Sequence, residues 1–397
     1  MISVEEAERL IAEHMPCFGV EECPLAEAHG AVLAEAVIAE RDQPPFDRVT
    51  MDGIAIASSA WDKGTRSFSY QHTQAAGAKE TALRDEASCI EIMTGAALPD
   101  GCDCVIPVER TQRDNDTISV SEDAQVGPGE NIHRRGSDYL QDSVLLTPGT
   151  VVGAPEMAVL ASAGRPTVKI GRKPTFRVIP VGDELVDVGK TIESFQIRRS
   201  NDRAMVAGLN QHGFQDVIAD HLPDDPAVLA ERIAVHLEEA DVLILSGGVS
   251  MGKYDYIPGI MRDLGVELIL HKVSQRPGKP MWFGIGPNDT AVFALPGNPV
   301  SALVCFTRYV MPAVAHALGA KRGVEQVNLA SPVEFKPALT YFLPVKLEYN
   351  EWGMAAIPAP TNTSGDFASL AGTAGFVELP KDVQNFPRGY TAPLYRW

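Results

Sequence analysis

Residues 291–303 have the sequence Ala-Val-Phe-Ala-Leu-Pro-Gly-Asn-Pro-Val-Ser-Ala-Leu. The apolar run before the Pro-Gly pair predicts a buried strand that ends in a tight turn. Asn298 and Pro299 then predict the cap and the first position of a helix. Such a turn directs free backbone N–H groups and the positive end of a helix dipole at one point. We therefore expect an anion to bind there.

A second apolar run that ends in glycines comes earlier in the chain, in residues 241–252, Asp-Val-Leu-Ile-Leu-Ser-Gly-Gly-Val-Ser-Met-Gly. Around the two runs we predict alternating elements, with strands at 176–181 and 216–219 and helices at 201–211 and 226–239. This alternation predicts an α/β domain with a parallel sheet. Because ligands of such sheets bind at the carboxyl ends of the strands, both glycine turns are candidate binding loops.

The flanking regions have other patterns. A capping box at Ser3 predicts a helix to about Met15, and a second helix is predicted from Leu25 to about Glu35. Residues 55–121 are polar and rich in turns with short apolar alternations, which predicts a small β-rich domain. A helix is predicted at 151–163, and short strands after Gly319 predict a C-terminal β domain.

Composition excludes several classes of protein. The chain has 397 residues, of which 45% are hydrophobic and 22% charged, as is usual for soluble proteins of roughly two to four domains. The formal net charge of −18 argues against a non-specific nucleic-acid binder. We expect a cytoplasmic protein without a membrane partner, because no apolar run approaches ~20 residues and no secretion signal is present. The six cysteines form no C-x-x-C pair, so reduced, buried thiols are expected.

Two acidic positions are candidate metal ligands. Asp183 and Glu184 follow the strand at 176–181, and adjacent carboxylates there either hold a hard divalent cation or only solvate an acidic turn. Asp255 either caps the helix that follows it or reaches a metal that bridges phosphates. Ser250 and Ser301 likewise either cap helices or donate hydrogen bonds to an anion. The local sequence leaves these alternatives open.

Taken together, the motifs resemble those of the molybdopterin molybdenumtransferases, the family of MoeA and of the E domain of gephyrin-type proteins. The resemblance covers nearly the whole chain in the family order, and it matches least after about Gly319. The matching segments are Pro44–Asp47 with Met51–Gly53, Ile92–Ala96 with Leu98–Pro99, Asn131–Asp138, Gly182–Leu185, Ser200–Asn201, Ser246–Gly252, Arg276–Pro280 and Leu295–Ser301.

The resemblance implies an α/β multidomain fold with four domains. A three-layer, molybdopterin-binding-like α/β domain would occupy residues 173–319. The remaining domains would be an elongated helical N-terminal domain (1–45 plus 140–172), a small β-rich domain (46–139) and a C-terminal β domain (320–397). The family works as an elongated homodimer, and molybdopterin adenylyltransferase is a candidate protein partner.

The resemblance also implies an activity and a site. The family inserts molybdate into adenylylated molybdopterin and releases AMP and molybdenum cofactor, assisted by Mg²⁺ or another divalent cation. The implied catalytic residues are Asp52, Thr94, Asp138, Glu184 and Asp255, with Glu184 and Asp255 as metal ligands. The first three would complete the site across the dimer. The implied substrate-binding residues are Gly247, Gly248, Ser250, Lys272, Arg276, Lys279, Pro296, Asn298, Pro299 and Ser301. Asp224 also matches a family carboxylate, although its role could be limited to capping a helix.

The chain differs from the usual family pattern near the predicted site, at Arg48, Val49, Thr50, Ile54 and Pro180–Val181. Three alternatives to the enzyme are therefore kept. One is a paralogue with altered activity, and another is a close relative that adenylylates molybdopterin. The third is a gephyrin-like dimeric scaffold, whose partner peptide would bind an apolar groove formed by Phe342–Pro344 and Phe376–Val377.

Overall fold

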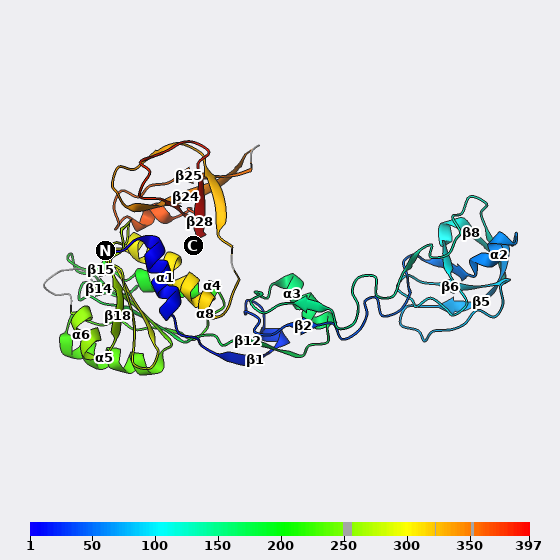
Figure 1. Cartoon of the computed structure of the whole chain (residues 1–397), viewed down its shortest axis with the longest axis horizontal. Coiled ribbons are helices and arrows are strands. Elements are labelled where there is room, and N and C mark those ends of the chain that lie inside the picture. The colour runs from blue at the N-terminus through cyan, green and yellow to red at the C-terminus, as the bar shows by residue number, and fades with distance from the viewer. Residues whose placement is uncertain (249–255, 322, 351–352) are drawn as a thin grey trace. The chain divides into compact units, whose positions relative to one another are not determined.

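The computed structural model describes residues 1–248, 256–321, 323–350 and 353–397. The chain divides into two units, which we describe separately (Figure 1). The larger unit consists of Met1–Glu35, Pro148–Met157 and Pro166–Trp397, and the smaller unit of Ala36–Thr147 and Ala158–Arg165. The predicted division into four domains stays a prediction.

A six-stranded sheet forms the centre of the larger unit, in the order β16-β13-β17-β21-β20-β18. Neighbouring strands are parallel from β16 to β21, whereas β20 is antiparallel to both of its neighbours, β21 and β18. The prediction of a parallel sheet is therefore wrong at this edge, because the short connection 286–290 makes a hairpin and cannot form a crossover. The strands are β13 (Phe176–Pro180), β16 (Val217–Ala219), β17 (Val242–Ser246), β18 (Glu267–His271), β20 (Trp282–Ile285) and β21 (Ala291–Leu295).

Helices cover both faces of this sheet, so the predicted three-layer arrangement is confirmed. Side chains alternate along β17: Val242 and Ile244 pack in one apolar cluster, whereas Leu243 and Leu245 pack in another. The first cluster includes residues of α1 (Val4–His14), α4 (Asn201–Gln211), α7 (Pro299–Cys305) and α8 (Met311–Ala317). The second includes residues of α5 (Pro226–Glu239) and α6 (Ile257–Asp263).

The ends of several helices agree with the prediction. The Ser3 hydroxyl accepts a hydrogen bond from the Glu6 N–H at the start of α1, and Asp225 caps α5. Helix α7 begins at Pro299 as expected, but the Asn298 side chain does not cap it. Its amide instead donates to the Ser364 hydroxyl, 2.8 Å away.

The predicted helix from Leu25 to Glu35 is wrong. Only a 3-10 turn forms, η1 (Leu25–Glu27). Gly30 has a φ of 77°, which ends any helical path. Beyond it the chain is extended, and Leu33 bridges Ile170 close to the pair formed by β1 (Val20–Pro24) and β12 (Thr167–Gly171). The predicted helix at 151–163 is present as α3 (Ala154–Ser162).

One helical stretch is longer and more apolar than the sequence analysis expected. Among the described residues, 299–317 form a helical stretch long and apolar enough to cross a membrane. Its central part is the π-helix η3 (Phe306–Val310), between α7 and α8. The stretch is 67% buried and packs in the apolar cluster against the sheet, which is the environment of a core helix.

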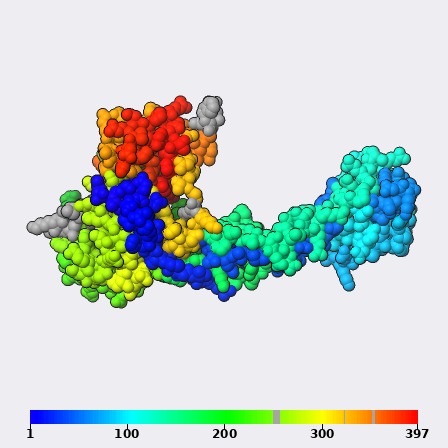
Figure 2. Space-filling model, in the orientation of Figure 1, coloured from blue at the N-terminus to red at the C-terminus, as the bar shows by residue number. Residues whose placement is uncertain are grey.

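The C-terminal region forms a barrel, as expected for a β domain. Strand β24 pairs with both β25 and β26, which closes the sheet on itself. Arg308 of η3 fixes the barrel to its neighbours, since its buried guanidinium donates to Glu8 of α1 (2.8 Å) and to Glu378 of β26 (2.7 Å). Figure 2 shows the C-terminal region, in red, lying beside the N-terminal segment, in blue. The strands are β19 (Gln275–Arg276), β22 (Glu325–Leu329), β24 (Thr340–Asn350), β25 (Gly353–Pro358), β26 (Gly375–Leu379) and β28 (Thr391–Arg396).

The smaller unit has its own six-stranded sheet, in the order β7-β4-β6-β5-β9-β8, which agrees with the predicted β-rich region. Its strands are β4 (Gly53–Ile56), β5 (Ser67–Gln74), β6 (Ser88–Ile92), β7 (Cys104–Pro107), β8 (Thr111–Asp114) and β9 (Thr117–Val120). Two short antiparallel pairs accompany it: β3 (Arg48–Val49) with β10 (Ile132–His133), and β2 (Val37–Ile38) with β11 (Val144–Leu146).

Candidate functional site

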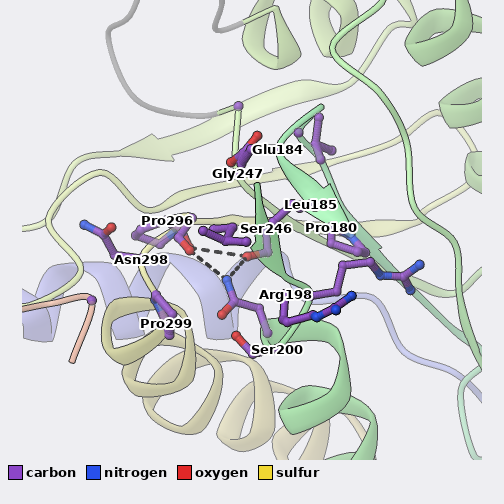
Figure 3. A pocket seen from close by; sticks show the side chains of 18 of the residues that line it. Pro180, Glu184, Leu185, Arg198, Ser200, Ser246, Gly247, Pro296, Asn298 and Pro299 are labelled. Atoms are coloured by element: carbon purple, nitrogen blue, oxygen red, sulfur yellow. Dashed lines mark hydrogen bonds between the residues drawn. The ribbon is translucent and has the colours of Figure 1, made fainter. Parts of the chain in front are cut away.

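A cavity of about 750 Å³ lies in the larger unit at the carboxyl ends of β13, β17 and β21 (Figure 3). Four segments line most of it: 180–185, 197–201, 246–248 and 296–299. Each of the three strands continues directly into a lining turn, as expected for a parallel sheet. Both glycine turns identified in the sequence therefore belong to one cavity.

The two glycine turns approach other parts of the backbone closely. Gly247 has a φ of 102°, and a Cβ atom there would lie 2.5 Å from the Val181 carbonyl oxygen. The Gly247 N–H donates to the Leu295 carbonyl, at 3.2 Å. A Cβ atom on Gly297 would lie 3.5 Å from the Gly247 Cα. The approach of Gly247 to Val181 therefore requires glycine, whereas the 3.5 Å at Gly297 is an ordinary van der Waals contact.

Asn201, the first residue of α4, joins the same two turns. Its amide nitrogen donates to the Ser246 hydroxyl (2.7 Å) and to the Gly297 carbonyl (2.8 Å) (Figure 3). Ser246 is buried and in turn donates to the Pro296 carbonyl. The side chains thus fix the spacing that the glycines permit.

Charged side chains of both signs line the cavity. The guanidinium of Arg199 pairs with the fully buried Asp202 carboxylate at 2.7 Å, so its charge is compensated. Arg198 donates to the Asp187 carbonyl oxygen and forms no ion pair with a carboxylate in the described part of the chain. Its positive charge is therefore available to an anionic ligand.

Among the described residues, the carboxylates that line the cavity are Glu184 and Asp224. The turns that carry them are joined, because the backbone N–H of Asp224 donates to the Asp183 carboxylate at 3.2 Å. Asp225, and not Asp224, caps helix α5. The capping alternative for Asp224 is therefore wrong. No group of three metal-ligating side chains is found among residues 1–248, 256–321, 323–350 and 353–397.

Several predicted residues lie together in this cavity: Glu184, Gly247, Gly248, Pro296, Asn298 and Pro299. Ser250 and Asp255 lie outside the described residues. Four others are described but do not line the cavity: Lys272, Arg276, Lys279 and Ser301. Ser301 is buried in α7, and Arg276 pairs with Tyr341 through β19. The substrate-binding role of these four residues stays a prediction.

The smaller unit holds the other predicted residues. The backbone N–H and the hydroxyl of Thr94 both donate to one carboxylate oxygen of Asp52, each at 2.7 Å. These bonds, the backbone one first, lower the pKa of the exposed Asp52 carboxyl. The Asp138 carboxylate lies 2.9 Å from Nε2 of His133. Asp52 and Thr94 are thus brought together, and Asp138 has a histidine partner that the sequence did not indicate.

Sequence reasoning did not assign Arg198, Arg199, Asn201 or Ser246 to the site. A signal was available for three of them, since Arg198 and Arg199 form a basic pair and Asn201 follows the predicted helix cap Ser200. Gly365 and Phe367 also line the cavity, but they come from the C-terminal region. Only the fold places them beside the strand ends.

Comparison with known protein families gives three matches that together cover most of the chain. The MoeA N-terminal region (domain I and II) matches residues 2–164. A probable molybdopterin binding domain matches residues 177–316, which contain the cavity turns. The MoeA C-terminal region (domain IV) matches residues 326–397.

Individual proteins match along all or nearly all of their length. The chain is 40% identical over 399 residues to a molybdopterin molybdenumtransferase of Synechocystis, with 100% of both chains covered. It is 32% identical to one of Staphylococcus epidermidis, covering 98% of this chain and 94% of that one. A solved structure of the molybdopterin biosynthesis MoeA protein from Pyrococcus horikoshii OT3 is 28% identical and covers 100% of both chains, with a TM-score of 0.82.

Proposed function

Because the chain belongs to the MoeA family of molybdopterin molybdenumtransferases, we propose that it is a transferase of molybdenum cofactor biosynthesis. It inserts molybdate into adenylylated molybdopterin and releases AMP. The observation that carries this proposal is the cavity formed by the two glycine turns within the region that matches a molybdopterin binding domain.

The cavity suits an anionic ligand of this size. Its volume of about 750 Å³ lies within the usual range for small-molecule and cofactor sites. The substrate carries a phosphoanhydride, and molybdate is a tetrahedral oxyanion. Both need concentrated N–H and cationic donors. Arg198 supplies the cation, and because the Gly247 N–H is already bonded to the Leu295 carbonyl, we assign the backbone donors to the other positions of the two glycine turns. We assign the phosphate groups to this part of the cavity.

The chain's own groups then have distinct roles. The glycine turns and Asn201 orient the phosphates, and Arg198 stabilises negative charge that develops on the leaving AMP. In the smaller unit, Asp52, Thr94 and Asp138 are proposed as catalytic residues. Asp52 acts as an ionised acceptor because its pKa is lowered.

The carboxylates Glu184 and Asp224 fit a Mg²⁺ ion that keeps water and phosphate as its other ligands. When bound, the ion would neutralise phosphate charge. Asp255 is a further proposed ligand on sequence grounds. A homodimer, a cytoplasmic location and an association with molybdopterin adenylyltransferase are proposed on the same family basis.

The scaffold alternative lacks its groove. Phe342, Leu343, Phe376 and Val377 have at most 1% of their surface exposed, because they lie in the packed interior. These side chains therefore cannot line an exposed groove for a partner peptide.

The direct test incubates the purified chain with adenylylated molybdopterin, molybdate and Mg²⁺, and measures AMP by chromatography. We expect AMP release that depends on molybdate. No release above a heat-denatured control contradicts the proposal. Consumption of ATP with free molybdopterin would assign the chain to the adenylylating relatives instead.

A further inference from the structure

Three side chains of the smaller unit form a continuous hydrogen-bonded row that no sequence motif indicated. Strands β3 and β10 are antiparallel, with Arg48 directly opposite His133. A guanidinium nitrogen of Arg48 lies 3.0 Å from Nδ1 of His133. Nε2 of the same ring lies 2.9 Å from a carboxylate oxygen of Asp138. The row thus runs from Arg48 through the imidazole to Asp138.

The chemistry of arginine settles the direction of both hydrogen bonds. A guanidinium has donors only and stays protonated in proteins, so Nδ1 of His133 must accept. An accepting Nδ1 carries no proton, and the ring is therefore the neutral Nε2–H tautomer. Nε2 then donates to Asp138, whose oxygen must accept. An imidazolium would place one N–H against another at Nδ1.

The Asp138 end of the row is held in place by the backbone. The Asp138 N–H donates to the Gln43 carbonyl at 2.9 Å. The turn before it is fixed by Asp47, which accepts from the Arg135 N–H (2.8 Å) and from the Arg134 guanidinium (2.7 Å). The turn that carries Asp138 is therefore fixed, and this places its carboxylate beside His133.

Charge compensation sets Arg48 apart from its neighbours. Arg134 is paired with Asp47, and Arg135 with Asp42 at 2.8 Å. Arg48 forms no ion pair with a carboxylate in the described part of the chain, and its guanidinium donates to the ring nitrogen of His133. The side chains of His133 and Asp138 are 31% and 44% exposed, so a substrate can reach this end of the row.

We propose that Arg48 and His133 are positioning residues that orient the carboxylate of Asp138, a role that rests on the proposed function. Arg48 selects the His133 tautomer, and His133 fixes one oxygen of Asp138. Asp138 then meets the substrate as a hydrogen-bond acceptor. Arg48, which differs from the usual family pattern, is on this account a working part of the site.

The first test needs no substrate. The full chain is labelled with ¹⁵N-histidine, and the His133 signals are assigned by their loss in His133→Asn. We expect Nε2 to carry the proton at neutral pH and Nδ1 to carry none. Arg48→Met should produce a mixture of tautomers. Arg110→Met, which removes an arginine paired with Asp123 elsewhere in the same unit, should leave the signals unchanged. A protonated Nδ1 in the parent chain overturns the proposal.

The second test compares two replacements of His133 in the AMP-release assay. Glutamine places an amide N–H near the position of Nε2 and keeps the donor to Asp138. Asparagine keeps a partner for Arg48 but cannot reach Asp138. We expect kcat to fall roughly tenfold in His133→Asn, the usual effect of losing a hydrogen bond to a charged group. His133→Gln should retain most of the parental kcat. The two variants should have equal melting temperatures.

Equal losses of kcat in the two variants overturn the positioning role. A parent chain that releases no AMP contradicts the proposed function and, with it, the part of Asp138 in that reaction. The ¹⁵N spectrum of His133 tests the directions of the two hydrogen bonds without substrate. A failure of the positioning role can therefore be distinguished from a failure of the proposed function.

Discussion

The cavity of the larger unit and the carboxylates of the smaller unit are built in different ways. The cavity is formed mainly by backbone, since its turns follow buried strands and Gly247 leaves no room for a larger residue. Asp52, Thr94 and Asp138 are held by side-chain hydrogen bonds on more exposed turns. A substitution in the backbone-built cavity should therefore lower the stability of the fold. A substitution among the side chains of the smaller unit should change charge or hydrogen bonding and leave the fold intact.

The largest effect is expected for Gly247→Val. A Cβ atom would collide with the Val181 carbonyl, and a φ of 102° strains any β-branched residue. We expect the free energy of unfolding to fall by about 4 kcal/mol and AMP release to be lost. Chemical denaturation measures the first and chromatography the second.

Gly259→Ala in α6 is the matched control, because none of the described residues lies within 4 Å of its added methyl group. Alanine is the better helix former, so this variant should be as stable as the parent or slightly more stable. A Gly247→Val protein with parental stability would contradict the backbone account.

Asp202→Asn should have the next largest effect. The Asp202 carboxylate is fully buried beside Arg199, which lines the cavity. Breaking a buried ion pair leaves an uncompensated charge, so we expect a loss of about 3 kcal/mol in the free energy of unfolding. Asp187→Asn breaks the solvent-exposed pair with Arg203 and should cost much less, because water screens that pair. Similar losses in the two variants would show that burial is not the cause.

Arg198→Met separates ligand binding from folding within the cavity. Because Arg198 has no carboxylate partner in the described residues, its loss should leave the melting temperature unchanged. We expect AMP affinity, measured by calorimetry, to fall roughly tenfold. The difference from the parent should shrink at high salt. Unchanged affinity for AMP would show that Arg198 does not contact the bound anion.

Thr94→Val tests the side-chain site by pH. The folded pKa of Asp52 is lowered, so its contribution to stability is present above its unfolded pKa and is lost as pH falls through the folded value. Valine removes the hydroxyl donor and keeps the backbone N–H, and the pKa of Asp52 should rise part of the way towards its ordinary value. Carboxyl ¹³C NMR titration measures it, and an unchanged pKa would contradict the assignment.

The smallest effect is expected at the cysteines. Cys17 is exposed, whereas the other five are buried, and burial raises the pKa of the Cys89, Cys102 and Cys305 thiols to about 12. One thiol should react quickly with a disulfide reagent in the native chain. Cys17→Ser should abolish that reaction without changing AMP release. Rapid reaction of a second thiol would show that one of the five buried cysteines becomes accessible to solvent in the native chain.

The backbone-built cavity was largely predictable from the sequence. A buried strand followed by glycines leaves a local signature, so both turns and the helix starts at Asn201 and Pro299 were identified. The antiparallel edge of the sheet was missed because the predicted alternation of strands and helices did not include β18 and β20. The predicted helix after Leu25 failed because long-range pairing of Leu33 outweighed local propensity.

The side chains that complete each site were less predictable. Arg198 and Lys279 are both basic residues near turns, and only the first lines the cavity. His133 and Arg48 are far apart in the sequence, and a strand pair brings them together. Such contacts are set by tertiary structure and have no short-range pattern.

Hydrogen–deuterium exchange of the full chain with and without AMP tests the central claim, that backbone turns at the strand ends hold the nucleotide phosphate. We predict that AMP slows exchange in peptides that contain Gly182–Glu184, Ser246–Gly248 and Pro296–Asn298. Binding of AMP without slower exchange in these peptides, or no binding at all, would contradict it.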